Sequence, residues 1–176
     1  MTKKTKTLTA RVTHLEMAAR PAKSVPLPSR PRTALLRAEN MPLHFYRYLY
    51  ERIGRAHHWY ERRGMDDDTL ADIIHSTDTV LEVLYADGCP AGFFELTKSA
   101  MKEDIELTYF GLMPEFQGKG LGRWFLHSAI QRAWDEKPDK VTVHTNTLDH
   151  PSALGLYQKM GFSAVAVSEE TVTVWD

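Results

Sequence analysis

The sequence has little cysteine and no long apolar segment. Its single cysteine, Cys89, has no partner for an intramolecular disulfide and lies in an Asp-Gly-Cys-Pro turn rather than beside a base. No stretch approaches the roughly 18 apolar residues of a membrane-spanning helix, and the first thirty residues lack the apolar centre of a secretory signal. These absences favour a reducing, cytoplasmic setting, and we expect no interaction with a membrane.

Patterns typical of metal sites and serine hydrolases are also missing. His57 and His58 are adjacent, whereas a zinc-binding helix spaces its two histidines four residues apart and adds further ligands at suitable intervals. Ser152 directly follows Pro151, and no Gly-x-Ser-x-Gly turn is present. We therefore expect neither a metal ion nor a serine nucleophile.

Charge is nearly balanced overall but unevenly distributed. The formal net charge is -1, yet residues 1–40 contain nine Lys or Arg against two Asp or Glu. This basic arm lacks interleaved aromatic residues and any recognisable motif for nucleic-acid recognition. We therefore interpret it as a solvated segment and expect no binding to nucleic acid.

Length and composition are those of an ordinary globular protein. With 176 residues, of which 43% are hydrophobic and 26% charged, the chain can bury a core without a metal or disulfide. We expect one domain over residues 1–176, with residues 1–6 as a mobile tail, and leave open whether it is a monomer or a homodimer.

The spacing of apolar residues predicts a mixed α/β fold. Asn40 is expected to cap the first helix, Asp87-Gly88 to turn a hairpin, and Pro114 to end a strand, while four prolines between residues 21 and 31 exclude regular structure there. A strand, helix and strand over residues 105–143 should form a parallel crossover. The expected strands span 8–17, 80–85, 91–96, 105–113, 141–143, 162–167 and 171–175, and the expected helices span 43–54, 68–74, 121–133 and 151–161.

A glycine-rich segment lies between an expected strand and an expected helix. Residues 117–122 read Gln-Gly-Lys-Gly-Leu-Gly, and unpaired amides at a helix start favour an anion there, with Lys119 and Arg123 adding positive charge. A P-loop is excluded because Met113 stands where its first glycine is needed, and a dinucleotide fingerprint because position 123 is Arg. The remaining alternative is a glycine loop that only permits a tight turn.

Two motifs at the appropriate separation resemble the GNAT superfamily of N-acetyltransferases. Gln117, Gly120 and Gly122 are similar to its Gln/Arg-x-x-Gly-x-Gly/Ala turn, and residues 156–162 resemble its Leu-Tyr-x-Lys-x-Gly-Phe helix end. The resemblance covers residues from about 105 to 162. It implies a mostly antiparallel, twisted sheet flanked by helices and splayed between its fourth and fifth strands. It also implies direct transfer of an acetyl group from acetyl-CoA to a primary amine.

The resemblance assigns candidate roles to particular residues. Tyr157 corresponds to the phenol that protonates the departing thiolate, and Glu106 to the strand glutamate that serves as base, with Glu95 as its rival. A backbone amide near the thioester would stabilise the oxyanion. His150 occupies a position where the superfamily commonly has an asparagine, so it could cap a helix, contact the cofactor or relay protons. The residues expected to bind coenzyme A are Leu112, Met113, Gln117, Gly118, Lys119, Gly120, Leu121, Gly122, Arg123 and His150.

The acceptor side is less specified. An aromatic and histidine-bearing segment, where the superfamily builds this side, could be either a substrate wall or core. Its members are Tyr46, Tyr48, Tyr50, His57, His58, Trp59 and Tyr60. The acceptor could be a small molecule or a protein amine. The competing function is a non-catalytic acyl-CoA sensor of the same fold.

Overall fold

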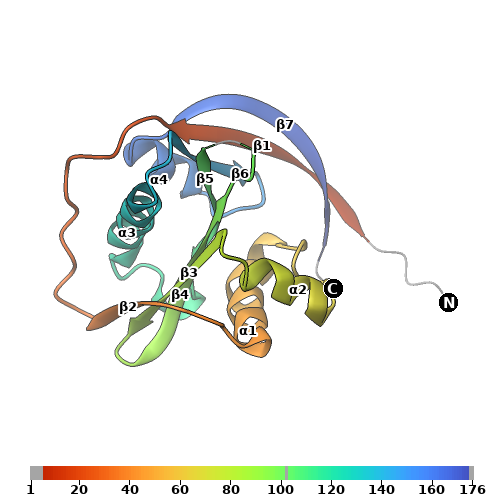
Figure 1. Cartoon of the computed structure of the whole chain (residues 1–176), viewed down its shortest axis with the longest axis horizontal. Coiled ribbons are helices and arrows are strands. Elements are labelled where there is room, and N and C mark those ends of the chain that lie inside the picture. Colours follow the sequence, from red (N-terminus) through yellow and green to blue (C-terminus); the bar gives the residue numbers. More distant parts are fainter. Residues whose placement is uncertain (1–5, 102, 175–176) are drawn as a thin grey trace.

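The computed structural model describes residues 6–101 and 103–174, and all of its strands belong to one sheet. The strand order is β2-β3-β4-β5-β6-β1-β7, so the first strand of the chain lies inside the sheet, between β6 and β7 (Figure 1). Only β5 and β6 pair in parallel, as expected for a strand-helix-strand crossover, and the other pairs are antiparallel. The strands are β1 (Thr7–Met17), β2 (Thr33–Arg37), β3 (Thr79–Ala86), β4 (Cys89–Lys98), β5 (Asp104–Leu112), β6 (Lys140–Asn146) and β7 (Ser163–Thr173).

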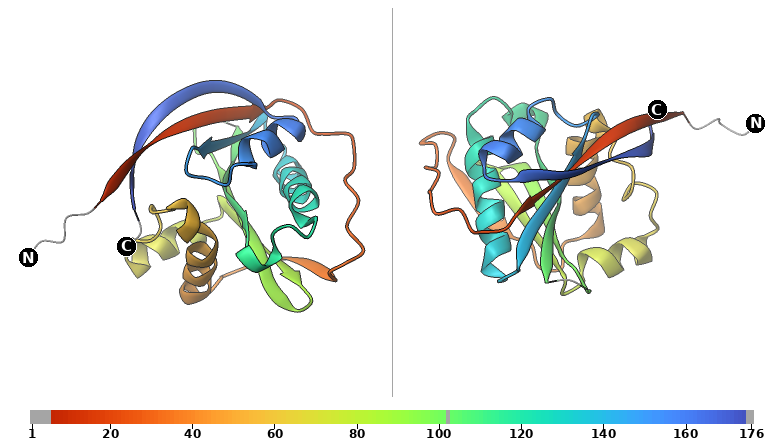
Figure 2. Two further views of the ribbon diagram at one scale, coloured as in Figure 1. Left: turned by 180° about the vertical axis from the view of Figure 1, so that it is seen from behind. Right: turned by 90° about the horizontal axis from the view of Figure 1, so that it is seen from above.

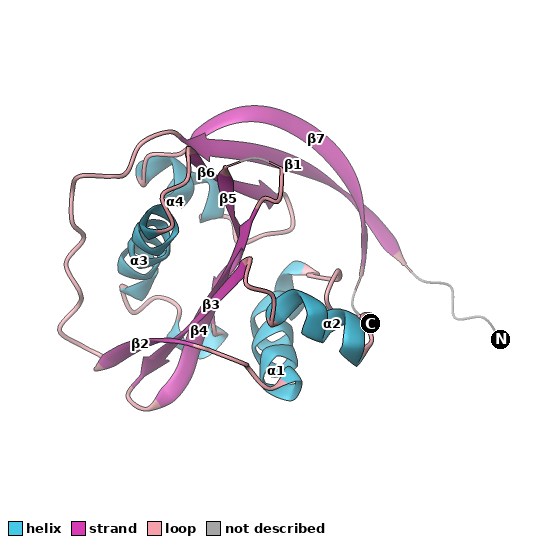
Figure 3. Cartoon of the chain, viewed as in Figure 1, coloured by secondary structure: helices cyan, strands magenta, loops and turns pink. Residues whose placement is uncertain are grey.

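Helices cover both faces of the sheet (Figure 3). The first pair, α1 (Leu43–Gly54) and α2 (Asp67–Ile74), packs on one face, and the second pair, α3 (Leu121–Asp135) and α4 (Ala153–Lys159), packs on the other. Each face has its own cluster of buried apolar side chains. Two short 3-10 helices, η1 (Arg55–His57) and η2 (Pro114–Phe116), were not predicted. No helix in the described part of the chain is long and apolar enough to cross a membrane.

Local signals explain several of these boundaries. Asp66 caps α2 by accepting a hydrogen bond from the Thr69 amide at 2.8 Å. Asp87 and Gly88 both have positive φ and turn the chain between β3 and β4, as the sequence predicts. The predicted cap of α1 is wrong, because Asn40 has a φ of 50° in the preceding turn and Pro42 occupies the cap position.

The prediction of two closing strands is also wrong. Residues 163–167 and 171–173 belong to one strand, β7, which pairs along its length with β1, and together the two strands form a long curved ribbon (Figure 2). The Lys6 carbonyl accepts a hydrogen bond from the Val174 amide, so residue 6 belongs to this ribbon rather than to a tail. Residues 1–5 and Trp175 lie outside the described residues. Strand β2, which follows the proline-rich segment, was not predicted.

The sheet opens between β5 and β6. Their parallel pairing extends only from Asp104 and Lys140 to Glu106 and Thr142, although both strands continue well beyond it. On the other side of β5, a bulge shifts the register with β4 between Glu95 and Leu96. The structure therefore has the splay that the resemblance implied, between strands 105–113 and 141–143 of the sequence prediction.

Candidate active site

A cavity of about 300 Å³ lies at this opening of the sheet. It is bounded by α1 and the segment after it, by the end of β5, by the glycine loop, by β6 and α4, and by β7. Pockets of this size at an irregularity in a sheet are typical of small-molecule sites. The sequence-predicted residues that line it are Leu112, Gln117, Gly118, Gly122, His150 and Tyr157.

The glycine loop forms the anion-binding end of the site. Gly118 and Gly120 have φ values of 71° and 76°, a region that favours glycine, and Gly120 caps α3 without any side-chain hydrogen bond. The first amides of α3 therefore lack a side-chain partner and combine with the positive end of the helix dipole. Lys119 and Arg123 are exposed beside them, whereas the Leu121 side chain is buried and offers only its backbone.

Leu112 and Met113 differ in what their amides can do. The Met113 amide donates to the Ala91 carbonyl at 2.8 Å, and its side chain is buried among those of the α1–α2 face. Because successive amides of a strand point to opposite edges, the Leu112 amide points toward the opened edge, where β6 no longer pairs. Of the two residues, only Leu112 can thus present its amide to a ligand in the cavity. Gln117 donates to the Leu112 carbonyl at 3.3 Å and links the loop to this strand end.

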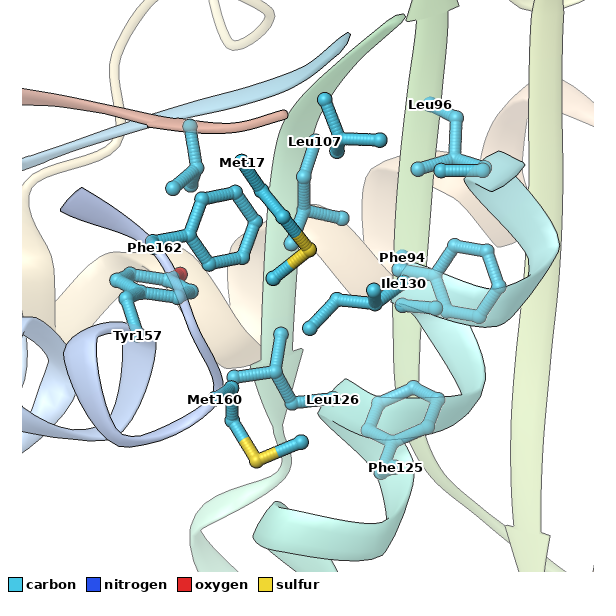
Figure 4. Close-up of a cluster of buried hydrophobic side chains, with 14 of the residues drawn as sticks. Met17, Phe94, Leu96, Leu107, Phe125, Leu126, Ile130, Tyr157, Met160 and Phe162 are labelled. Carbon is cyan, nitrogen blue, oxygen red and sulfur yellow. The ribbon is translucent and has the colours of Figure 1, made fainter. Parts of the chain in front are cut away.

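Tyr157 extends from α4 into the same cavity. Its side chain is 8% exposed, and its ring packs edge-on against Phe162 in the core beside α3 (Figure 4). No hydrogen bond to its hydroxyl is found within the described residues, although the residue lines the cavity. Burial raises the pKa of Tyr157 well above its usual range, and the nearby Asp149 charge raises it further. The phenol therefore keeps its proton at neutral pH.

Glu106 does not itself line the cavity, but it is bonded to a residue that does. Its Oε1 lies 2.8 Å from Nδ1 of His144 on β6, and His144 faces the cavity. The bond to Glu106 raises the pKa of His144 above its ordinary 6.5, and the charges of Glu170 and Glu61 add to the effect. His144 was missed in the sequence, although it alternates with the buried Val141 and Val143 and so had to face the opposite side of the sheet.

Glu95 is committed to a buried ion pair. Its side chain is fully buried, and it accepts hydrogen bonds from Tyr46 at 2.5 Å and from Arg62 at 2.8 Å. Both carboxylate oxygens are therefore occupied on the α1 side of β4, and Glu95 does not line the cavity. These contacts favour a structural role for Glu95 over the role of rival base.

Replacement of Glu95 by glutamine should destabilise the fold. We expect Glu95→Gln to lower the free energy of unfolding by about 3 kcal/mol, because the buried Arg62 charge loses its counter-ion. Thermal unfolding should show a midpoint lower by roughly 6–12 °C. Loss of activity at unchanged stability would instead identify Glu95 as a catalytic group.

His150 helps to begin α4. Its Nδ1 accepts hydrogen bonds from the Ser152 amide at 3.2 Å and from the Ser152 hydroxyl at 2.7 Å, directly before the first residue of the helix. It also lines the cavity, with its ring 6.3 Å from that of His57. Ser152 holds the cap position of α4 without a side-chain capping hydrogen bond, so His150 stabilises the turn before the helix rather than capping it, and contact with the cofactor stays a prediction.

The aromatic segment divides between core and cavity. Tyr46 is fully buried and Tyr48 is exposed on the other side of α1, and neither lines the cavity. The other five members of the segment line the cavity, namely Tyr50, His57, His58, Trp59 and Tyr60. Among the described residues, no group of three or more His, Cys, Asp or Glu side chains could hold a metal ion.

Comparison with known proteins places the chain in a family. Residues 46–162 match the acetyltransferase (GNAT) family. A Bacillus subtilis (strain 168) protein named as a ribosomal protein bS18-alanine N-acetyltransferase is 25% identical over 91 residues, which cover 52% of this chain and 58% of that protein. The chain thus matches less than two thirds of the length of this curated relative.

Solved structures share the fold at low sequence identity. The Escherichia coli ribosomal-protein-S18-alanine N-acetyltransferase has a TM-score of 0.62 at 15% identity, covering 81% of this chain and 94% of that one. A Novosphingobium aromaticivorans DSM 12444 protein, named as a GNAT-family acetyltransferase, has a TM-score of 0.63 at 16% identity. The match covers 96% of this chain and 66% of that one. With the family match extending over most of the sequence, including both motifs, the chain belongs to the acetyltransferase (GNAT) family.

Proposed function

We propose that the protein is an N-acetyltransferase that transfers the acetyl group of acetyl-CoA to a primary amine by direct attack. The observation that carries this proposal is that one cavity is lined by the glycine loop, by the opened edge of β5 and by Tyr157. A ligand in this cavity can therefore contact an anion site, an unpaired strand edge and a proton donor at the same time. Acetyl-CoA would supply an activated acyl group with a thiol leaving group.

The chain offers a suitable group for each part of coenzyme A. The amides of residues 118–122 and the charges of Lys119 and Arg123 suit a diphosphate. The edge of β5 that β6 leaves unpaired suits the amide-bearing pantetheine arm, which can bind as a further strand does. The Leu112 amide is the donor suited to the thioester carbonyl oxygen.

Proton transfer at the amine is assigned to the pair formed by Glu106 and His144. Attack requires a neutral amine, so a base must accept a proton from the ammonium form. His144 faces the cavity and Glu106 holds its other nitrogen, which orients the ring and raises its basicity. Glu106 therefore acts through His144, and Tyr157 donates the proton to the departing sulfur.

This assignment predicts a particular pH dependence. Because the pKa of His144 is raised, kcat should fall as the pH drops through that pKa and the imidazole becomes protonated. Glu106→Gln removes the carboxylate charge, so the pKa of His144 falls and the acidic limb should move to lower pH. The measurement is the pH profile of kcat with two acceptors of different amine pKa. If Glu106 took the proton directly, the variant would lose the limb rather than shift it.

The competing function is an acyl-CoA sensor without turnover. A steady-state assay of thiol release from acetyl-CoA, run with a panel of amines, separates the two. The transferase should release thiol only when an amine is present. A protein that binds acetyl-CoA but releases no thiol with any amine would be a sensor.

A further inference from the structure

Among the Asp, Glu, Lys and Arg side chains, only carboxylates line the cavity. Its lining includes the carboxylates of Glu61, Asp149 and Glu170, and none of the lining residues is Lys or Arg. Asp149 accepts hydrogen bonds from the Thr145 hydroxyl and the Asn146 amide on the same oxygen, Oδ2. Its charge adds to the effect of burial in raising the pKa of Tyr157, whereas the charges of Glu61 and Glu170 add to the raised pKa of His144, so these two carboxylates are the ones beside the acceptor.

Neutral donors hold these two carboxylates in place. The Tyr109 hydroxyl donates to Oε2 of Glu61 at 2.8 Å, and the Asn146 side-chain amide donates to Oε1 of Glu170 at 2.8 Å. Within the described residues, neither carboxylate forms an ion pair. Each has its second oxygen left for another donor. This differs from Glu95, whose charge is matched by Arg62.

The two carboxylates act on the same groups although they come from distant parts of the chain. Burial raises the pKa of Tyr60, and the charges of Glu170 and Glu61 raise it further. The same two charges also add to the raised pKa of His144, after the effect of Glu106. The negative potentials of Glu61 and Glu170 thus overlap at His144. In the proposed reaction, His144 is the group that faces the amine.

A second feature marks this cavity as a ligand site. The Tyr157 side chain is more than nine-tenths buried, lines the cavity and has no hydrogen-bond partner for its hydroxyl within the described residues. The hydroxyl is not among the fully buried side-chain atoms without a partner, so it is open to the cavity, where a ligand can bond to it. The acidic groups therefore line the same cavity as a hydroxyl that is available to a bound molecule.

We propose, on the basis of the proposed function, that the acceptor is a small diamine or polyamine whose second ammonium group binds between Glu61 and Glu170. One amine would be deprotonated beside His144 while the other remains charged. Uncompensated carboxylates in a cleft attract cations and raise their local concentration. The acceptor shares the cavity of about 300 Å³ with the thioester end of acetyl-CoA, which favours a slender alkyl chain at the reacting amine.

The test compares two acceptors of equal length. With acetyl-CoA saturating, kcat/KM is measured by thiol release for 1,5-diaminopentane and for 1-aminopentane. We expect kcat/KM to be about 25-fold higher for the diamine at low ionic strength, because each of two partly exposed ion pairs contributes a factor of roughly five. The preference should shrink as salt is added, because screening weakens exposed charge pairs.

Variants test the residues. In the Glu61→Gln/Glu170→Gln double variant, the preference for the diamine should fall to about threefold or less. The matched control is Glu169→Gln, because Glu169 is exposed on β7, adjacent to Glu170, and does not line the cavity. This control should keep the wild-type preference and its salt dependence.

The outcomes separate this inference from the proposed function. Equal use of both amines by the wild-type protein, or a preference that survives in the double variant, would overturn the diamine assignment and leave the transferase activity standing. A higher kcat/KM for a peptide amine with neutral side chains than for the diamine would also overturn it. Absence of thiol release with every amine would count against both.

Discussion

Replacement of Tyr157 by phenylalanine is expected to lower kcat about a hundredfold while changing the affinity for acetyl-CoA little. The phenol is held protonated by burial and lines the cavity, so it can donate a proton to the departing sulfur. A positioned general acid typically contributes a factor of about 10² to 10⁴. Steady-state kinetics and a direct titration with acetyl-CoA measure the two quantities.

The fold should tolerate this change. Phenylalanine keeps the ring that packs against Phe162 and removes only a hydroxyl without a partner in the described part of the chain (Figure 4). The thermal midpoint should therefore stay the same or rise slightly. A variant with full kcat would show that Tyr157 is a core residue and that another group, or water, protonates the thiolate.

Replacement of Gly120 by aspartate is expected to weaken acetyl-CoA binding about a hundredfold or more. Gly120 occupies the cap position of α3 beside the amides proposed to bind the diphosphate. An aspartate there would satisfy those amides itself and repel the diphosphate. The effect is measured as the dissociation constant for acetyl-CoA.

Asparagine at the same position is the matched control. Gly120 has a φ of 76°, and Asn and Asp tolerate this left-handed region about equally, so both variants carry similar backbone strain. Gly120→Asn lacks the negative charge and should lose affinity by only about tenfold or less. Equal losses in the two variants would attribute the effect to backbone strain, and no loss in either would place the diphosphate elsewhere.

Much of the fold was predictable because its signals are local. The Asp87-Gly88 turn, the periodic apolar residues of α3 and the glycine loop can each be recognised from a few neighbouring residues. β7 was divided into two because its mostly exposed side chains have little apolar pattern, and only its pairing with β1 makes it continuous. Pairing between the two ends of a chain leaves no local signal.

Only the part of the site that local motifs encode could be predicted from the sequence. The motifs located the glycine loop and Tyr157, but they named Glu106 without the His144 that connects it to the cavity. Glu61 and Glu170 are more than a hundred residues apart, and only the folded sheet places both at the acceptor end. Their roles depend on long-range contacts that no sequence motif contains.

The central claim is tested most directly by measuring the midpoint of thermal unfolding of the purified protein at increasing concentrations of acetyl-CoA. If the loop amides hold the diphosphate of a ligand whose thioester lies in the opened sheet, acetyl-CoA at about 100 times its dissociation constant should add roughly 2.7 kcal/mol of stability. For a chain of 176 residues, this corresponds to a rise of about 5–10 °C in the midpoint. NAD, which shares the diphosphate but not the pantetheine arm, should give a much smaller shift. A midpoint unmoved by acetyl-CoA would contradict the account.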